Sequence, residues 1–117
     1  MTDGLTESLT ARLADLAALN QTTHYGALAR DLGLTGPATI ARLTDALELL
    51  MDQDAAANRP LRAALVTARN STLPAPGFFA KAATLGLGHP DPTAFIANQR
   101  HALHIGSNIH PTSASVR

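Results

Sequence analysis

Leucine residues near the N-terminus repeat at the spacing of an α-helix. They follow one another at steps of four, four, three and three residues, as Leu5, Leu9, Leu13, Leu16 and Leu19. This spacing places all five side chains on one helix face and predicts an amphipathic helix over residues 4–19. Two uses of the face stay open at this point, packing into the core or forming the contact of a homodimer.

The composition favours a core made of aliphatic side chains packed between helices. Of the 117 residues, 45% are hydrophobic and only 3% are aromatic. A chain of this length suits one domain, which we expect over residues 1–105, followed by a flexible tail over residues 106–117 that has no periodicity. The absence of cysteine excludes disulfides, a thiol nucleophile and cysteine-ligated metal sites.

The hydropathy pattern contains no targeting or membrane signal. No apolar run approaches the roughly 20 residues that a membrane-spanning helix needs. The first four residues, Met-Thr-Asp-Gly, lack the basic and then apolar layout of a signal peptide. We therefore expect a cytoplasmic protein that does not bind membranes.

Further patterns predict a mainly α fold with a small β element. A helix of about two turns is expected between a cap at Thr22 or Thr23 and Gly33, and a longer one over residues 37–57. Residues 61–68 and 73–76 are the candidates for extended strands, joined by a turn. After these strands, two more helices are expected, the first opening at Gly77 and the second at Asp91 and Pro92.

Residues 24–47 contain two predicted helices joined by a short glycine-containing turn. Their pattern is carried by Tyr25, Leu28, Ala29, Leu32, Gly33 and Leu34, followed by Thr39, Ile40, Leu43, Ala46 and Leu47. This pattern resembles a winged helix-turn-helix, and the strands expected over residues 61–76 stand where the wing of such a domain lies. The resemblance implies a non-enzymatic DNA-binding protein of the kind that regulates transcription in bacteria.

The resemblance also implies which residues contact double-stranded DNA. In winged helix-turn-helix proteins the second helix of the unit enters the major groove, while the preceding helix and the wing contact the backbone. Helix 37–57 would then read bases through Thr39 and Arg42, and a basic wing over residues 59–81 would bind phosphates. The full set of implied DNA-binding residues is Tyr25, Thr39, Arg42, Arg59, Arg62, Arg69 and Lys81.

Tyr25 enters this set through a narrower likeness. Residues 24–29, His-Tyr-Gly-Ala-Leu-Ala, are similar to the opening of the DNA-binding helices in alkylguanine alkyltransferases and alkyltransferase-like proteins. That likeness implies that Tyr25 presses on a DNA phosphate. The chain has no Pro-Cys-His-Arg motif and no cysteine, so the likeness extends neither to alkyl transfer nor to base flipping.

The formal net charge is zero, but the charges are unevenly distributed along the chain. Up to Asp54 there are eight acidic and three basic residues, and after Asp54 there are one acidic and six basic residues. Helix 37–57 itself carries Asp45, Glu48 and Asp52, which repel phosphates. The sequence therefore assigns most of the expected DNA contact to the wing.

No pattern in the sequence points to catalysis or to a cofactor. It contains no nucleophile elbow, no paired carboxylates in an apolar context and no glycine-rich phosphate loop. His101 and His104 share a face of the last helix, with His89 and His110 within reach, but no carboxylate cluster accompanies them. We expect no enzyme activity, no cofactor and no metal site.

An interaction module is the alternative function. The same fold can serve as an adaptor between proteins, since a fold does not fix a function. Its partner would contact the leucine face of residues 4–19 or, if the partner is basic, the acidic helix 37–57.

Overall fold

The computed structural model describes residues 3–108, and these form five α-helices, one 3₁₀-helix and a two-stranded sheet. In chain order the elements are α1 (Asp3–Leu19), β1 (Thr23–His24), α2 (Tyr25–Asp31), α3 (Thr39–Ala56), η1 (Arg62–Leu65), β2 (Val66–Thr67), α4 (Pro76–Thr84) and α5 (Pro92–Asn108). The fold is mainly α with a small β element, as the sequence predicts. In the described range, no helix is both long and apolar enough to span a bilayer.

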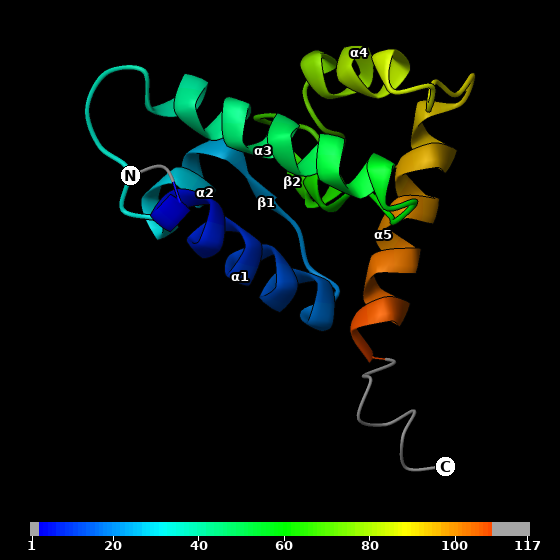
Figure 1. Cartoon of the computed structure of the whole chain (residues 1–117), viewed down its shortest axis with the longest axis horizontal. Helices are drawn as coiled ribbons and strands as arrows, with labels where there is room; N and C mark the ends of the chain where they lie inside the picture. Colours follow the sequence, from blue (N-terminus) through cyan, green and yellow to red (C-terminus); the bar gives the residue numbers. More distant parts are fainter. Residues whose placement is uncertain (1–2, 109–117) are drawn as a thin grey trace.

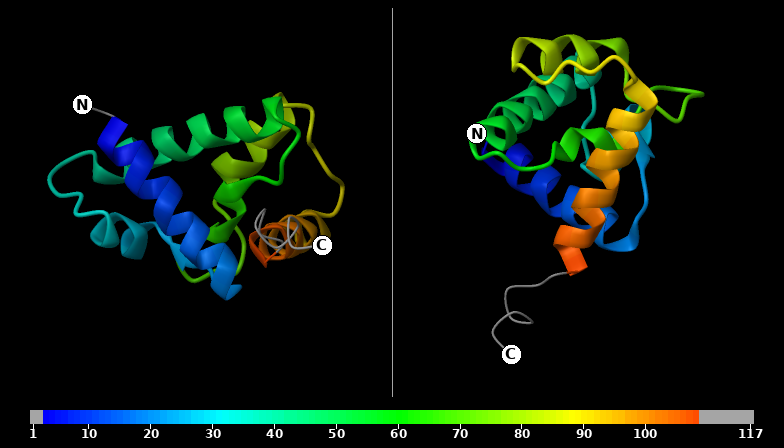
Figure 2. Two further views of the ribbon diagram at one scale, coloured as in Figure 1. Left: turned by 60° about the horizontal axis from the view of Figure 1, so that its bottom comes forward. Right: turned by 90° about the vertical axis from the view of Figure 1, so that its right-hand side faces the viewer.

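The leucine face of α1 lies inside the protein. Leu9, Leu13 and Leu16 are at most 2% exposed and belong to one core cluster with residues of α3, η1 and α5. In Figure 1 and in the right-hand view of Figure 2, α4 lies on the side of α3 that faces away from α1, while α5 crosses at the far end of both helices. The central part of this face therefore packs into the core, whereas Leu19 at its end is 62% exposed.

The β element differs from the expected wing. Strands β1 and β2 pair in parallel, with Thr23 opposite Val66 and His24 opposite Thr67. Residues 61–68 therefore do not form one side of an antiparallel hairpin, and residues 73–76 are not a strand. The reason lies in burial, because residues 63–67 are all buried and lack the alternation of a hairpin with one solvated face.

Two element boundaries also differ from the expected ones. Helix α3 starts at Thr39 and not at residue 37, because Gly36 and Ala38 take left-handed φ values of 89° and 62°. Helix α5 continues to Asn108, past the expected start of the tail at Gly106. The rest of that tail, residues 109–117, lies outside the described residues.

Candidate anion-binding site

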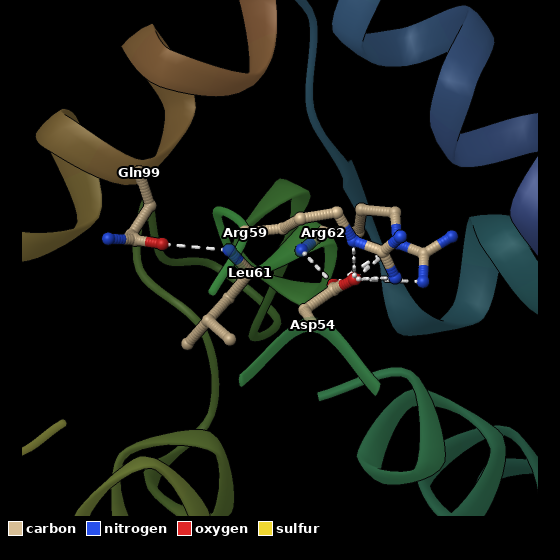
Figure 3. Close-up of polar contacts among 5 residues, drawn as sticks. All are labelled: Asp54, Arg59, Leu61, Arg62 and Gln99. Atoms are coloured by element: carbon tan, nitrogen blue, oxygen red, sulfur yellow. Dashed lines mark hydrogen bonds and ion pairs between the residues drawn. The ribbon is translucent and has the colours of Figure 1, made fainter. Parts of the chain in front are cut away.

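Two of the arginines expected to bind DNA pair with a buried aspartate at the C-terminal end of α3. Asp54 is fully buried, and its carboxylate accepts hydrogen bonds from the guanidinium groups of Arg59 (3.1 Å) and Arg62 (3.0 Å). The backbone N–H of Arg62 donates to the other carboxylate oxygen at 3.0 Å. Figure 3 shows both guanidinium groups converging on this one carboxylate. We call these three residues the Asp54 cluster.

Two further bases of the second half of the chain also have partners. The Lys81 ammonium lies 2.8 Å from a carboxylate oxygen of Asp52, and this hydrogen bond raises the pKa of Lys81. Arg100 donates to the backbone carbonyls of Ala64 (2.8 Å) and Thr72 (2.9 Å), and burial lowers its pKa. Lys81 joins α4 to α3, and Arg100 joins α5 to η1, so part of the donor capacity of each side chain is used within the protein.

A different set of basic groups surrounds a surface hollow of about 640 Å³. It is lined by His24, Tyr25, Gly26, Arg30, Ile40, Arg69 and Asn70. This cationic hollow combines the start of α2, the first turn of α3 and the turn after β2. Its lining contains two arginines and no acidic residue, so its electrostatic potential favours anions.

The arginines of the cationic hollow are free to bind an external anion. Within residues 3–108, the side chains of Arg30 and Arg69 make no hydrogen bond or ion pair, and both residues are exposed. Asp31, the acidic neighbour of Arg30, pairs instead with Arg12 at 3.2 Å. A guanidinium offers five donors in a fixed fork that matches carboxylate and phosphate oxygens.

His24 adds a donor beside Arg30. Its Nδ1 accepts the backbone N–H of Ala27 at 3.2 Å and caps α2, so the neutral imidazole carries its proton on Nε2. Gly26 lies between the two side chains, because a Cβ built there would be 3.7 Å from His24 Nδ1 and 3.8 Å from Arg30 Nη1. The imidazole and the guanidinium therefore flank the same point of the backbone.

An apolar cavity of about 170 Å³ lies beside the cationic hollow and shares Tyr25 and Ile40 in its walls. We call it the apolar slot; it is lined by Tyr25, Ile40, Thr44, Leu47, Glu48, Met51, Ala63, Ala75, Gly77 and Phe78. Burial raises the pKa of Tyr25, hydrogen bonding to the backbone of Ala75 lowers it, and the charge of Glu48 raises it. The Tyr25 phenol is thus engaged on the slot side of the residue.

The two residues expected to read bases lie on α3. Thr39 donates its hydroxyl to the carbonyl of Gly36 at 2.6 Å, which closes the turn before the helix. Arg42 is exposed, but Asp45 is exposed one turn further along the same helix. The twelve residues from Arg42 to Asp54 span about 18 Å of helix axis, so Arg42 is also remote from the Asp54 cluster.

Among the expected site residues, the structure brings Tyr25 and Arg69 together in the cationic hollow. It adds His24, Arg30 and Asn70, which the sequence analysis did not assign to a site. Arg30 could have been predicted as a phosphate contact, because it lies on the helix that contacts the DNA backbone in winged helix-turn-helix proteins. No sequence signal places it near Arg69, because the two residues come from distant segments.

Comparison with known proteins adds no relative to this description. No protein-family model matches the chain, and neither a curated protein nor a solved structure matches it. In the described part of the chain, no three His, Asp or Glu side chains gather closely enough to hold a metal ion. The arrangement of the cationic hollow is suited to binding an anion through donors that the protein leaves unused.

Proposed function

We propose that the protein is a non-enzymatic DNA-binding protein whose principal phosphate contact is the cationic hollow. One observation carries this proposal: Arg30 and Arg69, from two distant segments, have no acidic partner and line the same acid-free hollow. Phosphate oxygens are the natural ligands of such unpaired guanidinium groups.

The helix pair α2 and α3 fits this role in outline. In helix-turn-helix proteins the first helix contacts the backbone and the second enters the major groove. Arg30 lies on α2, and Arg42 is exposed on α3. Seven residues, 32–38, connect these helices, which is longer than the three or four residues common in this motif. The proposal therefore rests on phosphate contact through Arg30 and Arg69, with Arg42 exposed on α3 as a further contact.

The salt dependence of duplex binding tests the proposal quantitatively. Each phosphate contact contributes about −0.9 to the slope of log K against log salt, so Arg30, Arg42 and Arg69 together predict a slope of about −3. A surface that also used Arg59, Arg62 and Lys81 would give a slope of about −5. We expect the shallower slope in an anisotropy titration, because the second group of bases is paired with Asp54 and Asp52.

The decisive variant is Arg30→Gln combined with Arg69→Gln. We expect its slope to be shallower by about 2 than that of the parent protein. A matched control, Gln53→Glu with Asn98→Asp, makes the same change in net charge at exposed positions outside the hollow. An unchanged slope in the Arg30 and Arg69 double variant, or no binding of any duplex at low salt, contradicts the proposal.

A second candidate function is an adaptor that binds a basic protein through the outer face of α3. It is favoured by the exposure of Leu49 (46%), which is flanked on that face by Asp45, and by Asp52, which is paired with Lys81. The partner would be a basic segment with an apolar side chain for Leu49. In that case Leu49→Asp abolishes binding of the partner, and the Arg30 and Arg69 double variant leaves it intact.

A further inference from the structure

The apolar slot and the cationic hollow adjoin one another, and together they have the properties of a small-molecule site. Tyr25 and Ile40 form part of the walls of both. A ligand that passes between these two side chains would have one end among apolar groups and the other among unpaired donors. Small-molecule sites typically combine an apolar cavity with a few polar groups that fix orientation.

The volume of the slot limits what can enter it. At about 170 Å³ it is close to the roughly 150 Å³ of an engineered protein cavity that binds benzene. One aromatic ring fits a space of this size, and the rest of a larger ligand would extend into the hollow. The walls favour an aromatic ring, because Tyr25 and Phe78 offer ring faces and edges and Met51 offers a thioether.

The charges decide where the polar end of the ligand lies. Arg30 and Arg69 face the hollow without acidic partners, so a carboxylate placed there gains charge-assisted hydrogen bonds. Glu48 lines the slot and repels an anionic group placed inside it. The site therefore orients a ligand with its ring in the slot and its single negative charge in the hollow.

We infer that the apolar slot and the cationic hollow form one binding site for a small monoanionic aromatic acid of about the size of benzoate. The inference does not depend on DNA binding, since it rests on the slot as well as on the arginines. If DNA also binds, the two ligands compete for Arg30 and Arg69.

The test is an NMR titration of the folded protein with benzoate, with benzyl alcohol and inorganic phosphate as probes of the ring and of the charge. We expect benzoate to shift the methyl resonances of Leu47 and Met51, which line the slot and not the hollow, saturably and at lower concentration than benzyl alcohol does. Phosphate should perturb residues of the hollow only. Benzoate shifts confined to the hollow, equal to those of phosphate, would overturn the inference.

Variants separate the two parts of the site. Thr44→Phe fills the slot from α3 and should remove binding of both aromatic probes while phosphate binding persists. If this variant does not fold, Ile40→Ala is the second choice: it removes part of the shared wall at a position that is 47% exposed, and should weaken binding of both aromatic probes while phosphate binding persists. Retained benzoate affinity in a folded Thr44→Phe variant contradicts the proposed site.

The charge is tested with a matched pair of arginine variants. Arg69→Gln should weaken benzoate binding about tenfold, the change expected for losing one charge-assisted hydrogen bond. Arg42→Gln makes the same chemical change on α3 outside both cavities and should leave the affinity unchanged. Equal weakening by the two variants would mean a general charge effect and would overturn the assignment. Benzoate binding with no DNA binding, or the reverse, shows which of the two proposals fails.

Discussion

The two ends of α3 use arginine in opposite ways. At the C-terminal end, Arg59 and Arg62 share the buried carboxylate of Asp54, which balances one of their two positive charges. At the N-terminal end, Ile40 faces a hollow in which Arg30 and Arg69 have no partner among the described residues. The residue type is the same, but only in the second pair do both guanidinium groups lack a partner among the described residues.

This difference changes the meaning of the charge distribution in the sequence. The second half of the chain carries an excess of bases, which suggests a continuous basic surface. In the folded protein, three of those bases form ion pairs with acidic residues near the C-terminal end of α3. Arg59 and Arg62 pair with Asp54, and Lys81 pairs with Asp52. A local excess of basic residues in the sequence therefore does not predict a basic surface here. The acidic residues at the end of α3 pair with basic residues that follow the helix in the chain.

The largest expected effect comes from removing the shared carboxylate. Asp54→Ala leaves Arg59 and Arg62 without an acceptor, and we expect a loss of about 3 kcal/mol in the free energy of unfolding. This lies at the lower end for a broken buried ion pair, because the Arg59 side chain is 54% exposed and can be hydrated. Chemical denaturation with an unchanged m-value measures the loss.

The matched control for this variant is Asp31→Ala. Asp31 pairs with Arg12, but both side chains are substantially exposed, so the expected loss is about 1 kcal/mol or less. If Asp54→Ala loses no more than Asp31→Ala does, then the Asp54 cluster does not hold the end of α3 and its arginines are free to act elsewhere.

A smaller effect distinguishes the arginines themselves. Arg62→Gln removes bonds to a buried carboxylate, and hydrogen bonds to charged groups contribute about 1.5–3 kcal/mol to stability. Arg69→Gln removes an exposed side chain with no partner among the described residues and should change stability by about 0.5 kcal/mol or less. Chemical denaturation of the two variants measures this difference, and we expect the lower midpoint for Arg62→Gln. Equal midpoints would mean that the arginines at the two ends of α3 do not differ in their contribution to stability.

Local patterns in the sequence predicted the helices because helix periodicity and caps depend on near neighbours. The leucine face of α1 is an example. The cap of α2 was expected at Thr22 or Thr23 but is His24, because Thr23 pairs with Val66 in the sheet. The strand expected over residues 73–76 is wrong, and the one expected over residues 61–68 is reduced to Val66 and Thr67 in β2, because residues 62–65 form a 3₁₀-helix. The partner of β2, β1, lies about forty residues earlier and could not be inferred from local sequence.

The candidate site was only partly predictable for the same reason. The spacing of Asp54, Arg59 and Arg62 is short enough that an ion-pair cluster could have been considered from the sequence. The cationic hollow joins Arg30 to Arg69, and the parallel pairing of β1 with β2 connects the segments next to them. That pairing depends on the whole fold, and no local pattern in either segment predicts it.

The smallest expected effect concerns Tyr25, which lies between the apolar slot and the cationic hollow. Burial raises its pKa above the ordinary value of 10.0, and the charge of Glu48 adds to the rise. Since this is the one tyrosine of the chain and there is no tryptophan, the phenolate absorbance reports on this residue alone. We expect a titration midpoint above 10.0 in the folded protein, and a lower midpoint in Glu48→Gln.

The raised pKa has a consequence for stability with a definite sign. The folded protein holds the phenol proton more tightly than the unfolded chain, so the stabilisation is complete below pH 10 and is lost as the pH rises through the folded pKa. Tyr25→Phe should make this alkaline decline smaller, and the part due to Lys81, whose pKa is also raised, should remain. A midpoint at or below 10.0, or the same decline in Tyr25→Phe, would mean that the phenol is solvated. In that case water enters the slot beside Tyr25. The N-terminal end of α3 would then differ from the C-terminal end in its unpaired arginines but not in having an apolar cavity.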